Sequence, residues 1–198
     1  MSSSEPTPAP EPAPEQVPSS GSAAGPAPVP ARRNRRLVVW MAAIAVTVAL
    51  VDQLTKYWAE RVLAGHGLVE VIGEVIQFRL IYNPGAAFSI ASGMTWLLTL
   101  IVVVVVVVIL RASSRIGSRG WAVALGLLLG GAVGNLVDRL FRQPGFPQGH
   151  VVDFIDYAGW FVGNVADIAV VCGAVLIGLL TLRGIGIDGT RATGHRKP

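Results

Sequence analysis

Four long apolar stretches separate the polar segments of this chain. They cover residues 37–51, 94–110, 121–140 and about 161–182, and the first continues through Asp52 to about residue 57. A helix needs about 20 mostly apolar residues to cross the hydrocarbon core of a bilayer. The second stretch holds seven consecutive valines, which favour strands in water, but an open strand in lipid leaves backbone groups without partners. The pattern therefore predicts an α-helical integral membrane protein with four transmembrane helices.

The two segments that join these stretches on one side of the membrane differ in pattern. Within residues 58–93, apolar and polar side chains alternate from Ile76 to Leu80, which is typical of a half-buried strand. We expect a small extracytoplasmic subdomain that contains β-structure and lies on the outer surface of the membrane. Residues 141–160 hold two prolines and two glycines between Pro144 and Gly149, and this composition predicts a loop.

The two ends of the chain differ from its apolar body. Residues 1–31 hold nine of the thirteen prolines and no aromatic residue. Such a segment cannot bury enough apolar surface to offset its chain entropy, so we predict disorder. The expected organisation is a disordered cytoplasmic tail (1–31), a four-helix membrane domain (32–184) and a basic cytoplasmic tail (185–198).

Charge distribution predicts the orientation in the membrane. Only 14% of the residues are charged, and the formal net charge is +4. Eleven of the sixteen Lys and Arg residues lie before the first stretch, between the second and third, and after the fourth. Because such residues accumulate in cytoplasmic segments, both termini are expected in the cytoplasm. Topology thus explains the basic balance, and we predict membrane lipid as a partner and no nucleic acid.

Polar side chains near the outer ends of the apolar stretches are the candidate functional residues. Ionisable groups in membrane segments are costly and usually face a protein interior or a wet cavity. By the predicted topology, all of them lie near the outer leaflet, so we expect one shared polar cavity. They are Asp52, Lys56, Asn83, Gly85, Asn135, Asp138, Arg139, Asp153, Asn164 and Asp167.

Each group also has a simpler structural interpretation. Asp52 and Lys56, four residues apart, could form an ion pair at the interface, with the lysine extending toward water. Asn83 begins an Asn-Pro-Gly turn signal, and Asp167 could be a carboxylate favoured by the start of a helix. The single cysteine, Cys172, is expected to be a buried packing residue. No His-Glu-x-x-His metal motif is present.

Two carboxylates that converge in a partly dry cavity cannot both ionise easily. One can then accept a proton from water while the other donates one to a carbonyl oxygen, which is the chemistry of amide hydrolysis. Spacing alone leaves open which two of Asp138, Asp153 and Asp167 form the pair. A small transporter, a lipid-binding scaffold and a presenilin-like protease remain as alternatives.

Five segments resemble, in order, the motifs of the lipoprotein signal peptidases (signal peptidase II), a family of bacterial membrane aspartyl proteases. The resemblance covers about residues 37–183. The segments are Asp52-Gln53 to Lys56, Asn83-Pro84-Gly85-Ala86-Ala87-Phe88, Gly134-Asn135-Leu136-Val137-Asp138-Arg139, Val151-Val152-Asp153-Phe154 and Asn164-Val165-Ala166-Asp167.

The resemblance implies an activity and a place in the cell. The enzyme would be an aspartic endopeptidase of the bacterial cell membrane, with its active site near the outer leaflet. It would remove the signal peptide from diacylglyceryl-modified prolipoproteins by cleaving before the lipidated cysteine. No metal and no organic cofactor are implied, and inhibition by globomycin, a cyclic peptide antibiotic, is expected.

The resemblance also implies residue roles. Asp153 and Asp167 would be the catalytic pair, and the other motif residues would shape the site or hold the substrate. Asp138 would take a supporting role, with Arg139 as its expected partner. The family commonly has an aromatic residue at the position of Gly163, so we expect a shifted or looser start of the last helix.

Overall fold

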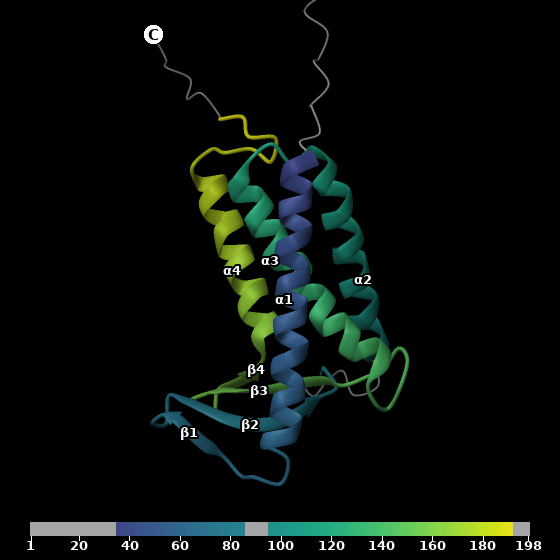
Figure 1. Ribbon diagram of the computed structural model, residues 1–198, viewed down its shortest axis with the longest axis vertical. Coiled ribbons are helices and arrows are strands. Elements are labelled where there is room, and N and C mark those ends of the chain that lie inside the picture. The colour runs from purple at the N-terminus through teal and green to yellow at the C-terminus, as the bar shows by residue number, and fades with distance from the viewer. Residues whose placement is uncertain (1–34, 86–94, 192–198) are drawn as a thin grey trace, which may run out of the picture. The chain divides into compact units, whose positions relative to one another are not determined.

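The computed structural model describes residues 35–85 and 95–191. Within this part of the chain, α1 (Arg35–Val62), α2 (Thr95–Ala112), α3 (Arg119–Phe141) and α4 (Val165–Leu182) form a bundle, with a small sheet at one end (Figure 1). A short 3-10 helix, η1 (Ser113–Arg115), connects α2 to α3. All four α-helices are long and apolar enough to cross a membrane. The predicted fold class, four transmembrane helices with a small β-containing subdomain, is confirmed.

Helix α3 lies at the centre of the bundle and packs against α1, α4 and α2. Two adjacent glycines allow the close approach of its two main neighbours. A Cβ atom on Gly130 would lie 2.7 Å from the carbonyl oxygen of Ala45 in α1, and one on Gly131 would lie 2.5 Å from that of Ala166 in α4. Small residues thus let the helix backbones touch, which is the usual basis of helix packing in lipid.

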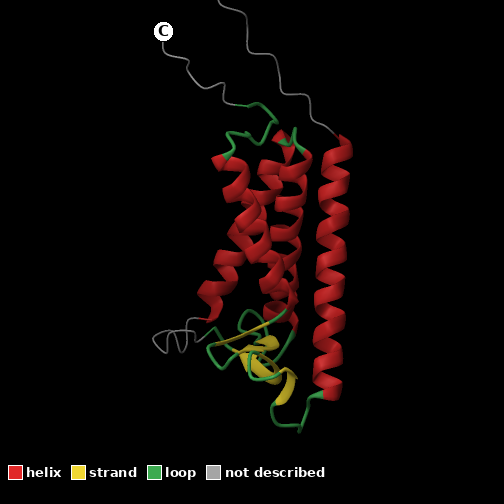
Figure 2. Cartoon of the chain, turned by 90° about the vertical axis from the view of Figure 1, so that its left-hand side faces the viewer, coloured by secondary structure: helices red, strands yellow, loops and turns green. Residues whose placement is uncertain are grey.

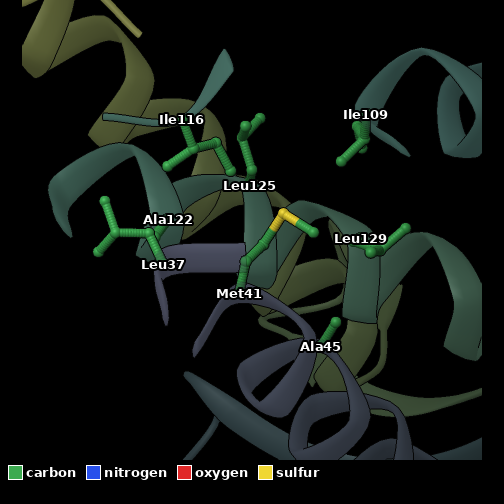
Figure 3. Packing of buried hydrophobic residues seen from close by; sticks show 8 residues of the cluster. All are labelled: Leu37, Met41, Ala45, Ile109, Ile116, Ala122, Leu125 and Leu129. Carbon is green, nitrogen blue, oxygen red and sulfur yellow. The ribbon is translucent and has the colours of Figure 1, made fainter. Parts of the chain in front are cut away.

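An apolar cluster joins α1, α2 and α3 toward the end of the bundle away from the sheet, and Figure 3 shows its side chains from close by. Met41 of α1, only 2% exposed, lies among side chains of α2 and α3 and of the segment that joins them. The cluster consists of Leu37, Met41, Ala45, Ile109, Ile116, Ala122, Leu125 and Leu129.

The sheet has four antiparallel strands in chain order: β1 (Val69–Ile72), β2 (Ile76–Asn83), β3 (Val151–Tyr157) and β4 (Phe161–Gly163). Figure 2 shows the strands gathered beside one end of the helices, next to the last turns of α1. Aromatic rings hold them there, because Trp58 of α1 meets Phe78 of β2 and Phe154 of β3 edge-on, with ring centroids 5.5 and 6.2 Å apart. The sheet is therefore fixed to the bundle through the end of α1.

Two expectations about element boundaries were wrong. The segment 141–160, predicted as a loop, contains β3, because no Pro or Gly lies between Gly149 and Gly159 and the apolar run from Val151 is buried between strands. The fourth helix begins at Val165 instead of about residue 161, because Phe161–Gly163 pairs with β3 as an edge strand. The expected strand around Ile76–Leu80 is confirmed as β2.

Cys172 was also wrongly predicted, because it lies exposed on the outer side of α4. The predicted disordered tail (1–31), residues 86–94 of the predicted β-rich segment and residues 192–198 of the predicted basic tail lie outside the described residues. The start of α1 and the end of α4 lie together, at the end of the bundle away from the sheet (Figure 1).

Candidate active site

A buried lysine lies at the centre of the polar side chains. Lys56 and Asp52 share one face of α1, and both are 0% exposed. The ammonium Nζ lies 2.8 Å from an oxygen of Asp52 and 2.7 Å from one of Asp138, and it donates to Oδ1 of Asn135 at 2.9 Å. The interpretation of an interfacial lysine that extends toward water is therefore wrong. All three donors of the ammonium have partners within the protein.

Asp138 of α3 is fully committed to structural contacts. Besides Lys56, it accepts from Nε of Arg142 at 2.7 Å, from the Gln53 amide at 3.1 Å and from the backbone N–H of Val152 at 3.2 Å. The expected Asp138–Arg139 pair is not among these contacts, so that prediction was wrong. Since a carboxylate held by two cations is a poor proton shuttle, these contacts disfavour Asp138 as a member of the pair.

Asp52 connects the first helix to the last. Its Oδ1 accepts from the backbone N–H of Ala166 in the first turn of α4 at 2.9 Å, while its Oδ2 meets Lys56. Gly134 of α3 leaves the room for this, because a Cβ atom there would lie 2.5 Å from the Asp52 carboxylate. Asp52 therefore sets the position of the start of α4, where Asp167 lies.

Arg139 holds the Asn83-Pro84-Gly85 turn against α3. Its guanidinium donates to the carbonyl oxygens of Pro84 at 3.4 Å and Gly149 at 3.2 Å. Gly85 has a φ of +97°, a conformation that disfavours a side chain, and its N–H donates to Oδ1 of Asn83 at 2.7 Å. Because that oxygen already accepts a hydrogen bond within the turn, the NH₂ group of Asn83 faces away from the turn and is available as a donor.

Asparagine amides bind both remaining aspartates. Asp153 of β3 is 2% exposed, and its Oδ2 accepts from Asn83 at 2.8 Å while its Oδ1 accepts from the Asn164 side chain at 2.6 Å. Asp167 accepts from the Asn135 side chain at 2.9 Å and from the backbone N–H of Asn164 at 3.0 Å. Asn164 is thus bound to both carboxylates at once.

The start of α4 explains how Asn164 and Asp167 are positioned. Asn164 is the N-cap residue and accepts from the backbone N–H of Asp167, while the Asp167 carboxylate accepts from the backbone of Asn164. This reciprocal capping box fixes both side chains relative to the helix axis. The start of α4 is therefore not loose, and it lies at Val165, four residues after the start expected from the apolar pattern.

Asn135 is oriented by its neighbours on both sides. Its Oδ1 accepts from Lys56, and an ammonium can only donate, so the NH₂ group of Asn135 must turn the other way, toward Asp167. The buried lysine thereby determines which atom of Asn135 meets the aspartate.

The environment of Asp153 favours its neutral form. Burial raises the pKa of this carboxyl from 3.8 to about 6, and the charge of Asp167 acts in the same direction. The amides of Asn83 and Asn164 oppose the shift, because they bind the charged form. A buried carboxyl that holds a proton near pH 6, beside a second carboxylate, suits general acid–base chemistry.

A pocket of about 310 Å³ opens beside Asp167, and its walls are mostly apolar. The ring of Phe161 stacks on Tyr157 with centroids 5.9 Å apart and also covers Gly163. A Cβ atom on Gly163 would lie 2.6 Å from the Phe161 ring and 2.9 Å from the Asp167 carboxylate. Phe161 therefore occupies the space next to this glycine. The pocket is lined by Tyr157, Phe161, Asp167, Ile168, Val171 and Cys172.

The structure thus brings together all ten predicted site residues. Sequence reasoning missed Gln53 and Arg142, which bind Asp138, and also Tyr157, which shares a strand face with Asp153. Alternation from Asp153 would have placed Tyr157 on that face, and the four-residue spacing of Asp138 and Arg142 would have predicted their ion pair. No local signal marks the contact of Arg142 with Glu60, 82 positions away. Among residues 35–85 and 95–191, no three His, Cys, Asp or Glu side chains gather as a metal site.

Comparison with known proteins places this polar network in a known family of sequences. Residues 44–183 match the family model of signal peptidase (SPase) II. The lipoprotein signal peptidase of Rhodococcus jostii is 49% identical over 162 residues, which are 82% of this chain and 81% of that protein. That of Mycobacterium avium is 47% identical over 168 residues, 85% of this chain and 88% of that protein.

The fold is similar to that of a solved bacterial membrane enzyme. The TM-score is 0.63 at 27% sequence identity, and the match covers 80% of this chain and 93% of the other. The range matched by the family model runs from α1 to the end of α4, so it includes every residue of the network described above.

Proposed function

Because this chain belongs to the signal peptidase II family of aspartic proteases, we propose that it removes the signal peptide from diacylglyceryl-modified prolipoproteins, cleaving before the lipidated cysteine. Asp153 and Asp167 are the catalytic pair in this proposal. The observation that carries it is the single asparagine, Asn164, bound to both carboxylates. Family membership also favours a protease over the transporter and scaffold alternatives.

The difference in burial suggests which aspartate acts as the general base and which as the general acid. Asp167 is partly exposed and lines the pocket, so its carboxylate is the base that takes a proton from water. The water oxygen then bonds to the scissile carbonyl carbon, while Asp153, whose pKa is raised, donates its proton to the carbonyl oxygen. When the C–N bond breaks, Asp167 gives its proton to the leaving nitrogen. The diol returns a proton to Asp153 as the acid forms.

The other residues of the network hold the pair in place. Asn83, Asn135 and Asn164 present amide groups beside the carboxylates and are also positioned to bind the peptide backbone of the substrate. Arg139 and Gly85 set the turn that carries Asn83, and Asp52, Lys56 and Asp138 join α1, α3 and α4 beneath it. Preorganised groups of this kind are effective because they need no rearrangement during the reaction.

The apolar pocket beside Asp167 supports a lipid-modified substrate. Ile168 and Val171 line it and are 43% and 60% exposed on the outer face of α4, so the pocket is continuous with the surface that would face lipid. A precursor in the outer leaflet could reach Asp167 from this side while its acyl chains remain in the membrane. The segment 58–93 is proposed as the cover that excludes water during cleavage.

The proposed location is the bacterial cell membrane, with both termini cytoplasmic and the aspartates near the outer leaflet. Charge counts support this orientation, and the described chain ends lie at the end of the bundle opposite the sheet. The tails 1–31 and 185–198 would then flank a membrane domain of residues 32–184. Globomycin is the proposed inhibitor.

The test uses the purified full chain in detergent, with a diacylglyceryl-modified precursor and the same precursor without lipid. Asp153→Asn and Asp167→Asn should each lower cleavage of the lipidated precursor by at least about a hundredfold, as expected for loss of general acid or base. Asp156→Asn is the matched control, since Asp156 lies three residues from Asp153 on the opposite face of β3. It should keep most of the activity.

Thermal unfolding of each variant shows whether the fold is kept. Cleavage at the wild-type rate by a folded Asp153→Asn or Asp167→Asn variant would contradict the proposed pair. Equal cleavage of the precursor without lipid would leave the pair standing and contradict the proposed substrate.

A further inference from the structure

The end of the bundle away from the sheet carries a concentration of positive charge. The described residues there include Arg35, Arg36, Arg111, Arg115, Arg119, Arg183 and Arg191, against one carboxylate, Asp188. That carboxylate accepts from the backbone N–H and the hydroxyl of Thr190, within its own turn. None of the seven arginines forms an ion pair with a carboxylate in the described part of the chain, where every such pair uses Lys56, Arg79 or Arg142.

Two of these arginines line one hollow between membrane helices. The hollow, about 420 Å³ in volume, lies between the first turns of α1 and α3. Arg36 comes from α1 and Arg119 from α3, and neither first turn contains an acidic residue. The remaining lining residues are Leu37 and Trp40, so the hollow has cationic groups and an apolar wall in one place.

Trp40 gives the hollow the character of a membrane interface. It lies one turn beyond Arg36 on α1 and is 63% exposed. Tryptophan is enriched where helices pass from hydrocarbon to head groups, because its ring is apolar and its N–H is polar. Leu37 is buried beside it as part of the apolar cluster. A molecule in the hollow would therefore meet positive charge at one end and an apolar surface at the other.

We infer that this hollow binds the head group of an anionic phospholipid, with the phosphate between Arg36 and Arg119 and the upper acyl chain against Trp40. Basic pockets between transmembrane helices are suited to anionic head groups. The guanidinium groups offer paired N–H donors that match phosphate oxygens. A free phosphate ion would use only the arginines, and the apolar wall favours a lipid over it. This site is separate from the aspartates, and its occupancy does not depend on the proposed proteolysis.

The test measures binding of single lipids to the full chain in detergent by native mass spectrometry. Phosphatidylglycerol, which is anionic, should bind more than tenfold tighter than phosphatidylcholine. Arg36→Gln and Arg119→Gln should each weaken phosphatidylglycerol binding about fivefold, as expected for one arginine at an anionic surface. Arg36→Lys keeps the charge and should retain most of the affinity. Arg183→Gln is the matched control, because Arg183 lies at the same end but lines neither this hollow nor the pocket beside Asp167.

Three outcomes would overturn the inference. Equal losses in Arg36→Gln, Arg119→Gln and Arg183→Gln would show a diffuse electrostatic attraction with no site. Equal affinity for the two lipids would show that the head-group charge is not recognised. Displacement of phosphatidylglycerol by an equal concentration of inorganic phosphate would show a site for the free ion. Unfolding midpoints of the variants should stay close to that of the wild type, since all the substituted side chains are exposed.

Discussion

The two ends of the helix bundle carry charge in opposite ways. At the end with the sheet, Lys56 and Asp138 are fully buried and each has several charged or polar partners. At the other end, seven arginines lie among the described residues without a carboxylate partner, at the surface. A charge removed from water needs compensation, whereas an exposed charge does not. Stability should therefore be sensitive to the charges at one end and almost indifferent to those at the other.

Replacing Lys56 should give the largest effect. Among the described residues, Lys56→Met removes the one cation paired with the buried Asp52 carboxylate and leaves Asp138 with Arg142 alone. Loss of one partner from a buried ion pair typically lowers the free energy of unfolding by about 3–5 kcal/mol. Thermal or denaturant unfolding in detergent measures this directly. Arg111→Gln at the other end is the control and should change stability by less than about 0.5 kcal/mol, so similar effects of the two would break the comparison.

Glycine substitutions should show the same difference between the two ends of the bundle. Gly134→Ala would place a methyl group against the Asp52 carboxylate and should destabilise the protein by about 1–3 kcal/mol through overpacking. Gly178→Ala, in the half of α4 away from the sheet, meets nothing within 4 Å. Its effect should stay within about 0.5 kcal/mol. Unfolding midpoints measured side by side check this, and equal losses would mean that the two sites are equally crowded.

Arg79 tests whether the stability effect of a charged side chain depends on its exposure or on its ion pair with a buried carboxylate. Its side chain is 44% exposed, yet it lies 2.9 Å from Oδ2 of Asp156, a buried oxygen with no hydrogen-bond partner in the described structure. Arg79→Gln should therefore lower the free energy of unfolding by about 1–2 kcal/mol, because the buried carboxylate loses the one cation that pairs with it among the described residues. In the double variant with Asp156→Asn, most of this loss should disappear. An unchanged unfolding midpoint in Arg79→Gln alone would show that the exposed pair contributes nothing.

The smallest effect concerns the titration of Asp153. With this carboxyl as the acid, kcat/KM for the lipidated precursor should fall as pH rises through about 6, because the proton it donates is lost. Asn83 lowers this pKa by binding the charged form, so Asn83→Leu should move the falling limb to higher pH as well as reduce the rate. A pH profile of both proteins measures the shift. A limb that stays in place would mean that Asn83 does not bind the charged form of Asp153.

The sequence predicted the parts of the fold that local pattern controls. Four apolar stretches are enough to predict four transmembrane helices, and alternation around Phe78 is enough to predict β2. β3 escaped prediction because both of its faces are buried, so it has no alternation, and because prolines and glycines precede it. The edge strand at Phe161 pairs through backbone groups, which carry no signature in the side chains.

The sequence was enough to predict which residues belong to the candidate site, but not which of them contact one another. Polar residues in apolar stretches mark a candidate site because a polar side chain in lipid carries a free-energy cost. Which carboxylate pairs with which cation depends on how α1 and α3 are rotated relative to each other. The prediction of an Asp138–Arg139 pair was based on their adjacency in the sequence and was wrong. Asp138 meets Lys56, 82 positions away, instead of the adjacent Arg139. Roles for Asp153 and Asp167 came from the family resemblance, and they stay predictions until the variants are measured.

The capping box at α4 has a consequence for the order in which the protein is made. The side chain of Asn164 binds Asp153, and its backbone binds Asp167, so both aspartates depend on a residue at the start of the last helix. A ribosome has synthesised more than four fifths of the chain before this residue appears. A nascent chain that has inserted only three helices holds Asp153 alone, without Asp167. The protein therefore gains its pair of carboxylates only when the final helix enters the membrane, and unfinished chains lack the proposed proteolytic centre.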